Sequence, residues 1–424
     1  MKKRYFSGSG VTIWETVLQN GMRVRVIPKP GFAKTLAYLA VDYGSIDTHF
    51  RIDGSDARTP DGVAHYLEHK MFDMPYGDAM DRFTELGGRP NAYTGYTLTA
   101  YYVECAENVP ENLQTLLEFV STPYFTEKSV EKERGIIAQE IRMYEDSADS
   151  RVYDRLFSAM YKEHPVRVPI AGTVESIQAI TPAVLERCHD AFYAPSNLML
   201  CVVGDVDPHM VEDVAAKTIP NGKRQIAQRI YGKDDPSRCL KARITDTMEI
   251  ALPTFVMGFK ADPPDSPMRA EMIGDLAADC LFGASTPFYK EYYEQGLIDT
   301  SFSAGYEGLK GIGMFTVGGD SRDPAAVTDA VFAAVRDALE RGIDKERFLR
   351  MKKATLGRML RGLDSFEELC SRSCGHCFEG EEYFLFDEVF RSIEVRDVEQ
   401  FLTSCLRPER CAISVIEPKQ KRGD

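Results

Sequence analysis

Long apolar runs are missing from this sequence of 424 residues. A membrane-spanning helix needs about eighteen or more successive apolar residues, and no segment reaches that length. The basic N-terminus leads into a Ser-Gly-Ser-Gly stretch at residues 7–10, and no apolar core of a signal peptide follows. The sequence therefore predicts neither membrane insertion nor secretion.

Positive charge is also in short supply. There are 51 Lys and Arg residues against 65 Asp and Glu residues, which gives a formal net charge of -14. No dense stripe of Lys and Arg overcomes this excess, so the summed field repels a phosphate backbone. Nucleic acid is excluded as the expected partner.

The ten cysteines show no spacing typical of a small disulfide scaffold. Scattered cysteines in a long chain suit a reducing compartment and free, mostly buried thiols, so we expect a cytoplasmic protein. With 44% hydrophobic and 27% charged residues the chain is typical of folded globular proteins. Its length is too great for one ordinary core and suits two domains.

Hydrophobic periodicity predicts an α+β protein built from two similar units in tandem. Each unit is expected to be an α/β sandwich, in which a mostly antiparallel sheet is covered by helices. The strand-like segments of the first half are residues 21–28, 35–43, 91–103 and 197–205. Its helical segments are residues 61–72, 77–86, 109–146 and 150–162, and residues 44–60 read as a polar loop.

A stretch rich in Lys, Arg, Asp, Gly and Pro divides the halves. We expect a first, catalytic domain at residues 1–220, a linker at 221–243 and a second domain at 244–424. The second domain repeats the element order of the first. Its expected strands lie around residues 244–260, 300–306, 311–318 and 411–416, and its helices at 268–281, 324–342 and 345–362.

The motif His65-Tyr66-Leu67-Glu68-His69 carries the chemistry. His65 and His69 are four residues apart on a helical stretch and share one face, with Glu68 beside them. Neutral imidazoles bind zinc, and a nearby carboxylate can take the proton of a zinc-bound water. Since the chain has only seven histidines, the motif would occur by chance in about one in a hundred such sequences. The second half has no counterpart of it.

A catalytic zinc also needs a third protein ligand. Glu133 and Glu140 are seven residues apart on the helical segment 130–145, which places both on one face. We expect one of them to bind the metal and the other to support the site. The alternative is that this Glu-rich helix faces solvent and binds no metal.

Four separated segments resemble the insulinase/pitrilysin family of inverzincin metallopeptidases, in particular its half-length bacterial members. These segments are residues 62–72 (GVAHYLEHKMF), 91–101 (NAYTGYTLTAY), 131–146 (EKERGIIAQEIRMYED) and 193–207 (YAPSNLMLCVVGDVD). The resemblance implies that one zinc ion per chain is bound by His65, His69 and Glu140. It further implies that Glu68 activates the attacking water and that Glu133 is an auxiliary carboxylate.

The resemblance also implies a substrate-binding strand at Asn91 and Ala92, an edge strand on which a peptide adds as a further strand. The alternative is an interior strand. In the second domain, family members often carry an Arg-Tyr pair that holds the substrate backbone. Here the corresponding segment, residues 285–300, carries Pro287 and Asp299 instead. Tyr292, Tyr293 and Tyr306 remain as possible substitutes.

A competing motif is Cys370-x-x-x-Cys374-x-x-Cys377, with His376 inside it. This spacing is that of a radical-SAM iron-sulfur loop. The cysteines lie late in the chain on a segment that reads as a helix, whereas such a cluster needs a loop after an early strand. Buried or incidental thiols are therefore the preferred interpretation.

The sequence thus predicts a cytoplasmic zinc endopeptidase that cleaves peptides or unfolded segments in an enclosed chamber. The attacking group is expected to be zinc-bound hydroxide, activated by Glu68. Because the chain has two domains where full-length relatives have four, we expect a homodimer or a heterodimer with a related subunit. The main alternative is a catalytically silent scaffold subunit of a peptidase complex.

Overall fold

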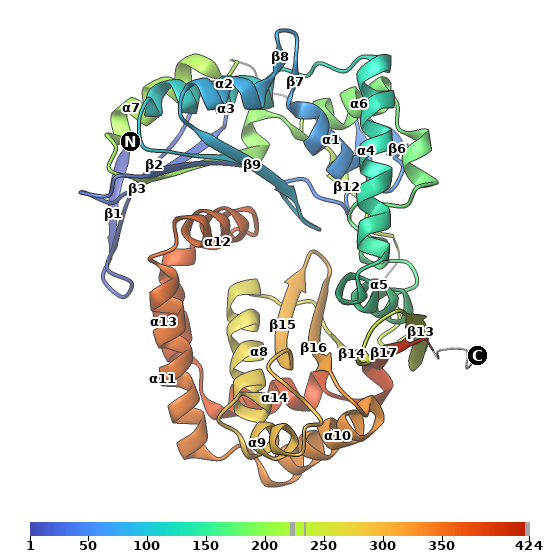
Figure 1. Ribbon diagram of the computed structural model, residues 1–424. Coiled ribbons are helices and arrows are strands. Elements are labelled where there is room, and N and C mark those ends of the chain that lie inside the picture. The colour runs from blue at the N-terminus through green and yellow to red at the C-terminus, as the bar shows by residue number, and fades with distance from the viewer. Residues whose placement is uncertain (221–224, 233–234, 420–424) are drawn as a thin grey trace. The chain divides into compact units, whose positions relative to one another are not determined.

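The computed structural model describes residues 1–220, 225–232 and 235–419 (Figure 1). By packing, the chain divides into two units, neither of which is one continuous stretch. The first unit comprises Met1–Ile141, Pro169–Tyr231 and Leu360–Phe386, and the second Arg142–Val168, Gly232–Met359 and Asp387–Asp424. The domain boundaries expected from the sequence stay a prediction, and residues 221–224 and 233–234 of the expected linker lie outside the described residues.

The first unit contains a seven-stranded sheet in the order β1-β2-β3-β11-β4-β10-β9. Neighbouring strands are antiparallel except for the parallel pair β3 and β11. The strands are β1 (Lys2–Phe6), β2 (Val11–Val17), β3 (Arg23–Pro28), β4 (Thr35–Val41), β9 (Arg89–Thr94), β10 (Thr99–Cys105) and β11 (Leu198–Gly204). The helices are α1 (Val63–Met71), α2 (Ala79–Glu85), α3 (Val109–Ser121), α4 (Glu127–Glu145), α6 (Pro182–Phe192), α7 (Pro208–Thr218) and α12 (Phe366–Phe378), of which α4 continues into the second unit.

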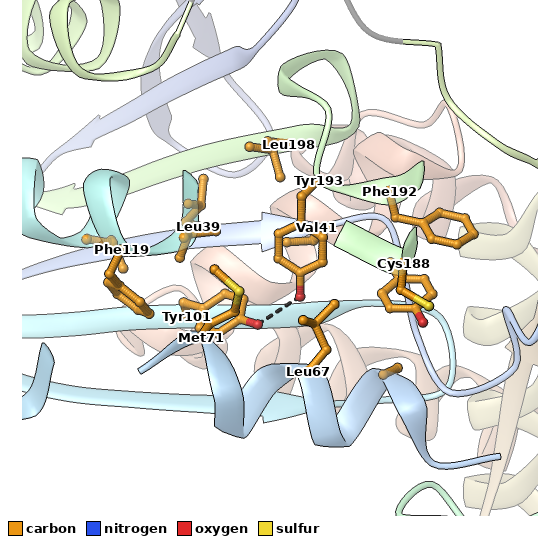
Figure 2. Packing of buried hydrophobic residues seen from close by; sticks show 14 of the residues in the cluster. Leu39, Val41, Leu67, Met71, Tyr101, Phe119, Cys188, Phe192, Tyr193 and Leu198 are labelled. Carbon is orange, nitrogen blue, oxygen red and sulfur yellow. Dashed lines mark hydrogen bonds between the residues drawn. The ribbon is translucent and has the colours of Figure 1, made fainter. Parts of the chain in front are cut away.

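Both faces of this sheet are covered, which explains why every residue of β4 and β11 is buried. Figure 1 shows α3 and α7 over one face and α12 across the other. On the face toward α1 and α3, Leu39 and Tyr101 pack against Leu67 and Met71 of α1 (Figure 2). The first unit therefore holds α1 firmly against the sheet through its apolar side.

Two of the expected loops and strands differ from the structure. The expected single strand at residues 91–103 is a hairpin, because β9 ends at Thr94 and the turn closes through the hydrogen bond from Gly95 N to Leu98 O. The expected loop at residues 44–60 contains the hairpin β5 (His49–Ile52) and β6 (Ser55–Arg58). Its turn residues Asp53 and Gly54 both have positive φ, as a tight two-residue hairpin requires.

The second unit contains a five-stranded sheet in the order β13-β17-β14-β16-β15. Its strands are β13 (Arg243–Met248), β14 (Thr254–Ala261), β15 (Ser303–Leu309), β16 (Ile312–Asp320) and β17 (Cys411–Pro418). Its helices are α5 (Ala148–Met160), α8 (Pro267–Phe282), α9 (Pro287–Glu294), α10 (Pro324–Arg341), α11 (Lys345–Gly362), α13 (Phe386–Ser392) and α14 (Val395–Cys405), with α11 and α13 each crossing the boundary between units.

The two sheets share one strand pattern. Once β1 and β2 of the first unit are set aside, the last strand of each sheet lies between the first and second, parallel to the first. In the first unit the hairpin of β9 and β10 forms the far edge, and in the second unit the hairpin of β15 and β16 does so. The pattern β3-β11-β4-β10-β9 of the first unit thus matches β13-β17-β14-β16-β15 of the second. The α+β fold of two similar units predicted from the sequence is confirmed.

Candidate active site

Helix α1 is short and almost entirely buried. It begins after Gly62, whose φ is 87° and whose hypothetical Cβ would lie 2.4 Å from Ala171 O, so only glycine fits there. Among its buried residues are His65 and Glu68. Polar side chains are costly to bury unless other polar groups meet them, so their surroundings define the site.

Three predicted metal ligands converge from two helices. His65 Nε2 lies 3.5 Å from Glu140 Oε1, and His69 Nε2 lies 3.4 Å from Glu140 Oε2. One donor atom from each of the three residues falls within 4.8 Å of the other two. The helical spacings that the sequence indicated on α1 and on α4 therefore bring these side chains to one point.

Glu133 is placed behind this group. Its Oε1 lies 3.0 Å from His69 Nδ1, so the ring presents Nε2 toward Glu140. Burial acts to lower the pKa of His69, but the hydrogen bond to Glu133 and the nearby carboxylates outweigh it and raise the pKa above its ordinary value. One turn away, the Tyr66 hydroxyl donates to Val130 O and ties α1 to α4.

Glu68 faces the same space from α1 and is only 7% exposed. The Thr94 hydroxyl on β9 donates to Glu68 Oε2 at 2.6 Å. Burial raises the pKa of the Glu68 carboxyl above its ordinary value, although Thr94 and the two imidazoles act in the opposite direction. A carboxylate whose pKa is raised is a stronger base, which suits a group that accepts a proton and returns it.

The donor set fits a zinc ion. Two imidazole nitrogens and one carboxylate are a common ligand set of catalytic zinc, which keeps one further position open. Ligands bound about 2.1 Å from a tetrahedral ion lie ~3.4 Å from one another, close to the separations between the imidazoles and Glu140. The site is therefore already spaced for a metal.

Strand β9 forms the edge of the seven-stranded sheet, next to α1. Its only strand neighbour among the described residues is β10. The Ala92 N–H is bonded to Asn91 Oδ1, and the Asn91 amide donates to the Tyr102 hydroxyl at 3.0 Å. Asn91 and Ala92 thus lie at an open edge, while their part in substrate binding stays a prediction. Thr94, two residues further on, was not identified from the sequence.

The second-unit tyrosines differ in surroundings. Tyr306 is 8% exposed and packs edge-on against Phe401, so its ring belongs to the core. On α9, Tyr292 lies against Phe288, and Tyr293 is exposed and stacks on Tyr289. The choice among these residues as a substrate anchor stays open.

The competing cysteine motif lies on α12, as the sequence indicated. Cys370 and Cys374 are buried against Cys201 of β11, and all ten cysteines are free thiols. In the part of the chain that the structure describes, neither of the two groups able to hold a metal contains a cysteine. The second of these groups is His376, Glu379 and Glu381, where His376 Nδ1 lies 3.6 Å from Glu379 Oε2 and 3.4 Å from Glu381 Oε2 and the ring stacks on Tyr383.

Within the described residues, no helix is both long and apolar enough to cross a membrane.

Comparison with known proteins identifies relatives along almost the whole chain. Residues 39–174 match the family profile described as insulinase (peptidase family M16), and residues 179–355 match the peptidase M16 inactive domain. An uncharacterised zinc protease of Bacillus subtilis, YmfH, is 36% identical over 418 residues, covering 96% of this chain and 97% of that protein. A second zinc protease of Bacillus subtilis, YmxG, is 24% identical over 432 residues and covers 99% and 98% respectively.

Solved structures of other peptidases have the same fold as this chain. An M16-like peptidase from Alicyclobacillus acidocaldarius superposes with a TM-score of 0.93 at 34% identity, covering 96% of this chain and 99% of that one. The periplasmic protease PqqL of Escherichia coli shares the fold, with a TM-score of 0.73 at 18% identity over 98% of this chain but only 48% of its own. The chain belongs to the insulinase family of zinc proteases, peptidase family M16.

Proposed function

We propose that this chain is a zinc-dependent endopeptidase that cleaves peptides or unfolded segments at the site formed by α1, α4 and β9. The observation that carries the proposal is the convergence of His65, His69 and Glu140 beside the buried carboxyl of Glu68. A scaffold protein has no use for this arrangement, because gathering these ionisable groups at one point, with His65 and Glu68 buried, costs stability. Membership of a zinc protease family supports the same conclusion.

In this proposal one zinc ion per chain is held by His65, His69 and Glu140. When bound, zinc polarises the substrate carbonyl and makes water more acidic. Glu68 takes the proton of the attacking water and returns it to the leaving amine, a role that suits its raised pKa. Glu133 fixes the orientation of the His69 ring through Nδ1.

The substrate is proposed to add to β9 as a further strand. The open edge at Asn91 and Ala92 supports this, since main-chain pairing accepts peptides of many sequences. Such binding requires an extended segment, so folded proteins are excluded as substrates unless they expose one.

We propose that a partner subunit completes an enclosed chamber in which the peptide is cleaved. PqqL, which shares the fold, is about twice as long as the part that matches this chain. We propose that this chain pairs with a second copy or with a related subunit, and that it works in the cytoplasm, where its ten free thiols stay reduced. Sedimentation velocity of the purified chain measures its assembly state.

The test of the proposed activity combines metal analysis with hydrolysis of a quenched peptide library. We expect one zinc per chain, cleavage that a chelator abolishes and added zinc restores, and a fall of about 10²- to 10⁴-fold in kcat for Glu68→Gln. The control is Glu68→Gln itself analysed for zinc, which it should retain. A native chain without zinc, or a Glu68→Gln chain that cleaves at the native rate, contradicts the proposal. A zinc-loaded chain that cleaves nothing in any assembly state indicates the silent scaffold instead.

A further inference from the structure

Thr94 joins the edge strand to the carboxyl of Glu68. It is the last residue of β9, it is 9% exposed, and its hydroxyl donates to Glu68 Oε2 at 2.6 Å. A hydrogen bond of this length to a carboxylate is among the stronger ones in proteins. The bond bridges two different elements, α1 and β9, within the first unit.

The main chain of Thr94 faces the open edge. In an antiparallel pair, residues alternate between pointing their N–H and C=O groups at the partner strand and away from it. Pro90 has no N–H to donate to β10, and the Ala92 N–H is bonded to the side chain of Asn91. Gly95 N–H does bond to Leu98 O across the hairpin. Thr94, in phase with Pro90 and Ala92, therefore directs its main-chain groups outward.

The side chain of Thr94 leaves the plane of the sheet toward α1, where its neighbours hold it in place. Its cross-strand partner is Thr99, whose hydroxyl donates to Tyr43 O at 2.9 Å and lies 3.5 Å from the Thr94 hydroxyl. Threonine is branched at Cβ, so its χ1 has few choices and the position of Oγ1 is fixed by the strand. Because this hydroxyl is bonded to Glu68, a movement of β9 would also move the Glu68 carboxyl.

We propose that Thr94 is a positioning residue for the base: it fixes Oε2 of Glu68, leaves Oε1 to take the proton of the attacking water, and couples this orientation to the seating of substrate on β9. This inference rests on the proposed function. It assigns different tasks to the two carboxylate oxygens, and it makes the strand that aligns the peptide also align the base. Such preorganisation acts on the chemical step more than on substrate affinity.

The test compares two substitutions at this position. Thr94→Val removes the hydroxyl but keeps the branched shape, and Thr94→Ser keeps the hydroxyl. We expect Thr94→Val to lower kcat about 10- to 100-fold, as the loss of one hydrogen bond to a charged group does, with KM changed less than about threefold. Thr94→Ser should stay within about fivefold of the native kcat, because its donor remains. All rates are taken per zinc-loaded chain.

The matched control is Thr99→Val, which removes the neighbouring hydroxyl of the same hairpin, 3.5 Å from that of Thr94, but leaves the bond from Thr94 to Glu68 in place. A loosened hairpin would lower the activity of Thr99→Val and Thr94→Val alike, whereas the proposal predicts a large fall for Thr94→Val alone. If Thr94→Val does not accumulate as folded protein, Thr94→Ala removes the same hydroxyl without the added methyl group.

Three outcomes overturn the inference while the native chain is active: native kcat in the variant without the hydroxyl, a loss confined to KM, or an equal loss in Thr94→Ser. A native chain without zinc or without hydrolysis overturns the proposed function as well. The two failures are therefore distinguishable by the native chain alone.

Discussion

Each unit places a helix at the equivalent point of its own sheet, but the contacts that the helix makes with the edge strand differ between the units. Helix α1 follows β4 after the hairpin of β5 and β6 and packs against the edge strand β9. Helix α8 follows β14 directly and packs against the edge strand β15. The contact between α1 and β9 includes a buried hydrogen bond, from the Thr94 hydroxyl to Glu68. The contact between α8 and β15 is close packing, in which a Cβ on Gly274 would lie 2.2 Å from the Tyr306 Cβ.

This difference separates the fold from the chemistry. One backbone arrangement supports a cluster of buried and half-buried ionisable groups in one unit and a tight steric contact in the other. The first arrangement costs stability and offers reactivity, while the second is dominated by packing, with one long hydrogen bond from Tyr306 N to Asp275 Oδ1 at 3.5 Å. Four substitutions, taken from the largest expected effect to the smallest, test whether the chemistry belongs to the first unit alone and the close packing to the second.

The largest effect is expected from His69→Ala in α1, compared with Asp275→Ala in α8. Removing one of two imidazole ligands should release the zinc and lower kcat/KM about 10³-fold or more, because catalytic zinc needs three protein ligands. Asp275→Ala should retain both zinc and turnover. Metal analysis measures the zinc content of each variant, and peptide hydrolysis measures its turnover. Equal losses in both variants would show that the second unit also carries catalytic chemistry.

A smaller effect is expected from Glu133→Gln. The substitution keeps the shape of the side chain but weakens its hold on His69 Nδ1, so zinc affinity should fall about 10- to 100-fold. Competition with a chromophoric chelator measures the affinity. The matched control is Glu131→Gln on the same helix, where the side chain is 72% exposed and pairs with Arg134. An unchanged affinity in Glu133→Gln would remove this residue from the site.

In the second unit, Gly274→Ala should destabilise the fold. The added Cβ collides with Tyr306, and overpacking of this kind costs about 1–3 kcal/mol. Urea unfolding followed by circular dichroism gives the change in the free energy of unfolding. Zinc content should not change. If stability is unaffected, the close contact of α8 with β15 is not the feature that distinguishes this unit.

The smallest effect, of opposite sign, is expected from Gly135→Ala in α4. Gly135 is an exposed helical residue with no atom within 4 Å of a hypothetical Cβ. Alanine should therefore raise the free energy of unfolding by about 0.5–1 kcal/mol, because glycine loses more backbone entropy in a helix. The same urea experiment measures it, with Gly274→Ala as the contrasting variant. A loss of stability would mean that α4 needs flexibility at this point.

The sequence indicated the metal-site geometry because helical spacing is local. Residues four or seven apart on a helix share a face wherever the helix lies, so His65 with His69 and Glu133 with Glu140 could be paired in advance. That the two helices would meet came from the resemblance to a family and from chemistry, which asks for a third ligand. The structure brings the four side chains together.

Contacts that depend on strand register could not be derived in this way. The bond from Thr94 to Glu68 joins residues 26 positions apart, and it depends on where β9 packs against α1. The single strand predicted at residues 91–103 did not include the turn that follows Thr94. The Asp53-Gly54 pair was a readable signal for the hairpin of β5 and β6, since this dipeptide favours positive φ at both positions.

The composition of the first unit has a consequence for the order of synthesis. Arg25 is buried, donates to Ser373 at 2.7 Å and pairs with Glu382 at 2.9 Å, and both partners lie in the segment 360–386. A nascent chain makes Arg25 early and meets these partners only after more than 370 residues have been translated. Residues 1–220 alone would leave that guanidinium without these two partners, so the face of the sheet that α12 covers (Figure 1) is completed only near the end of translation.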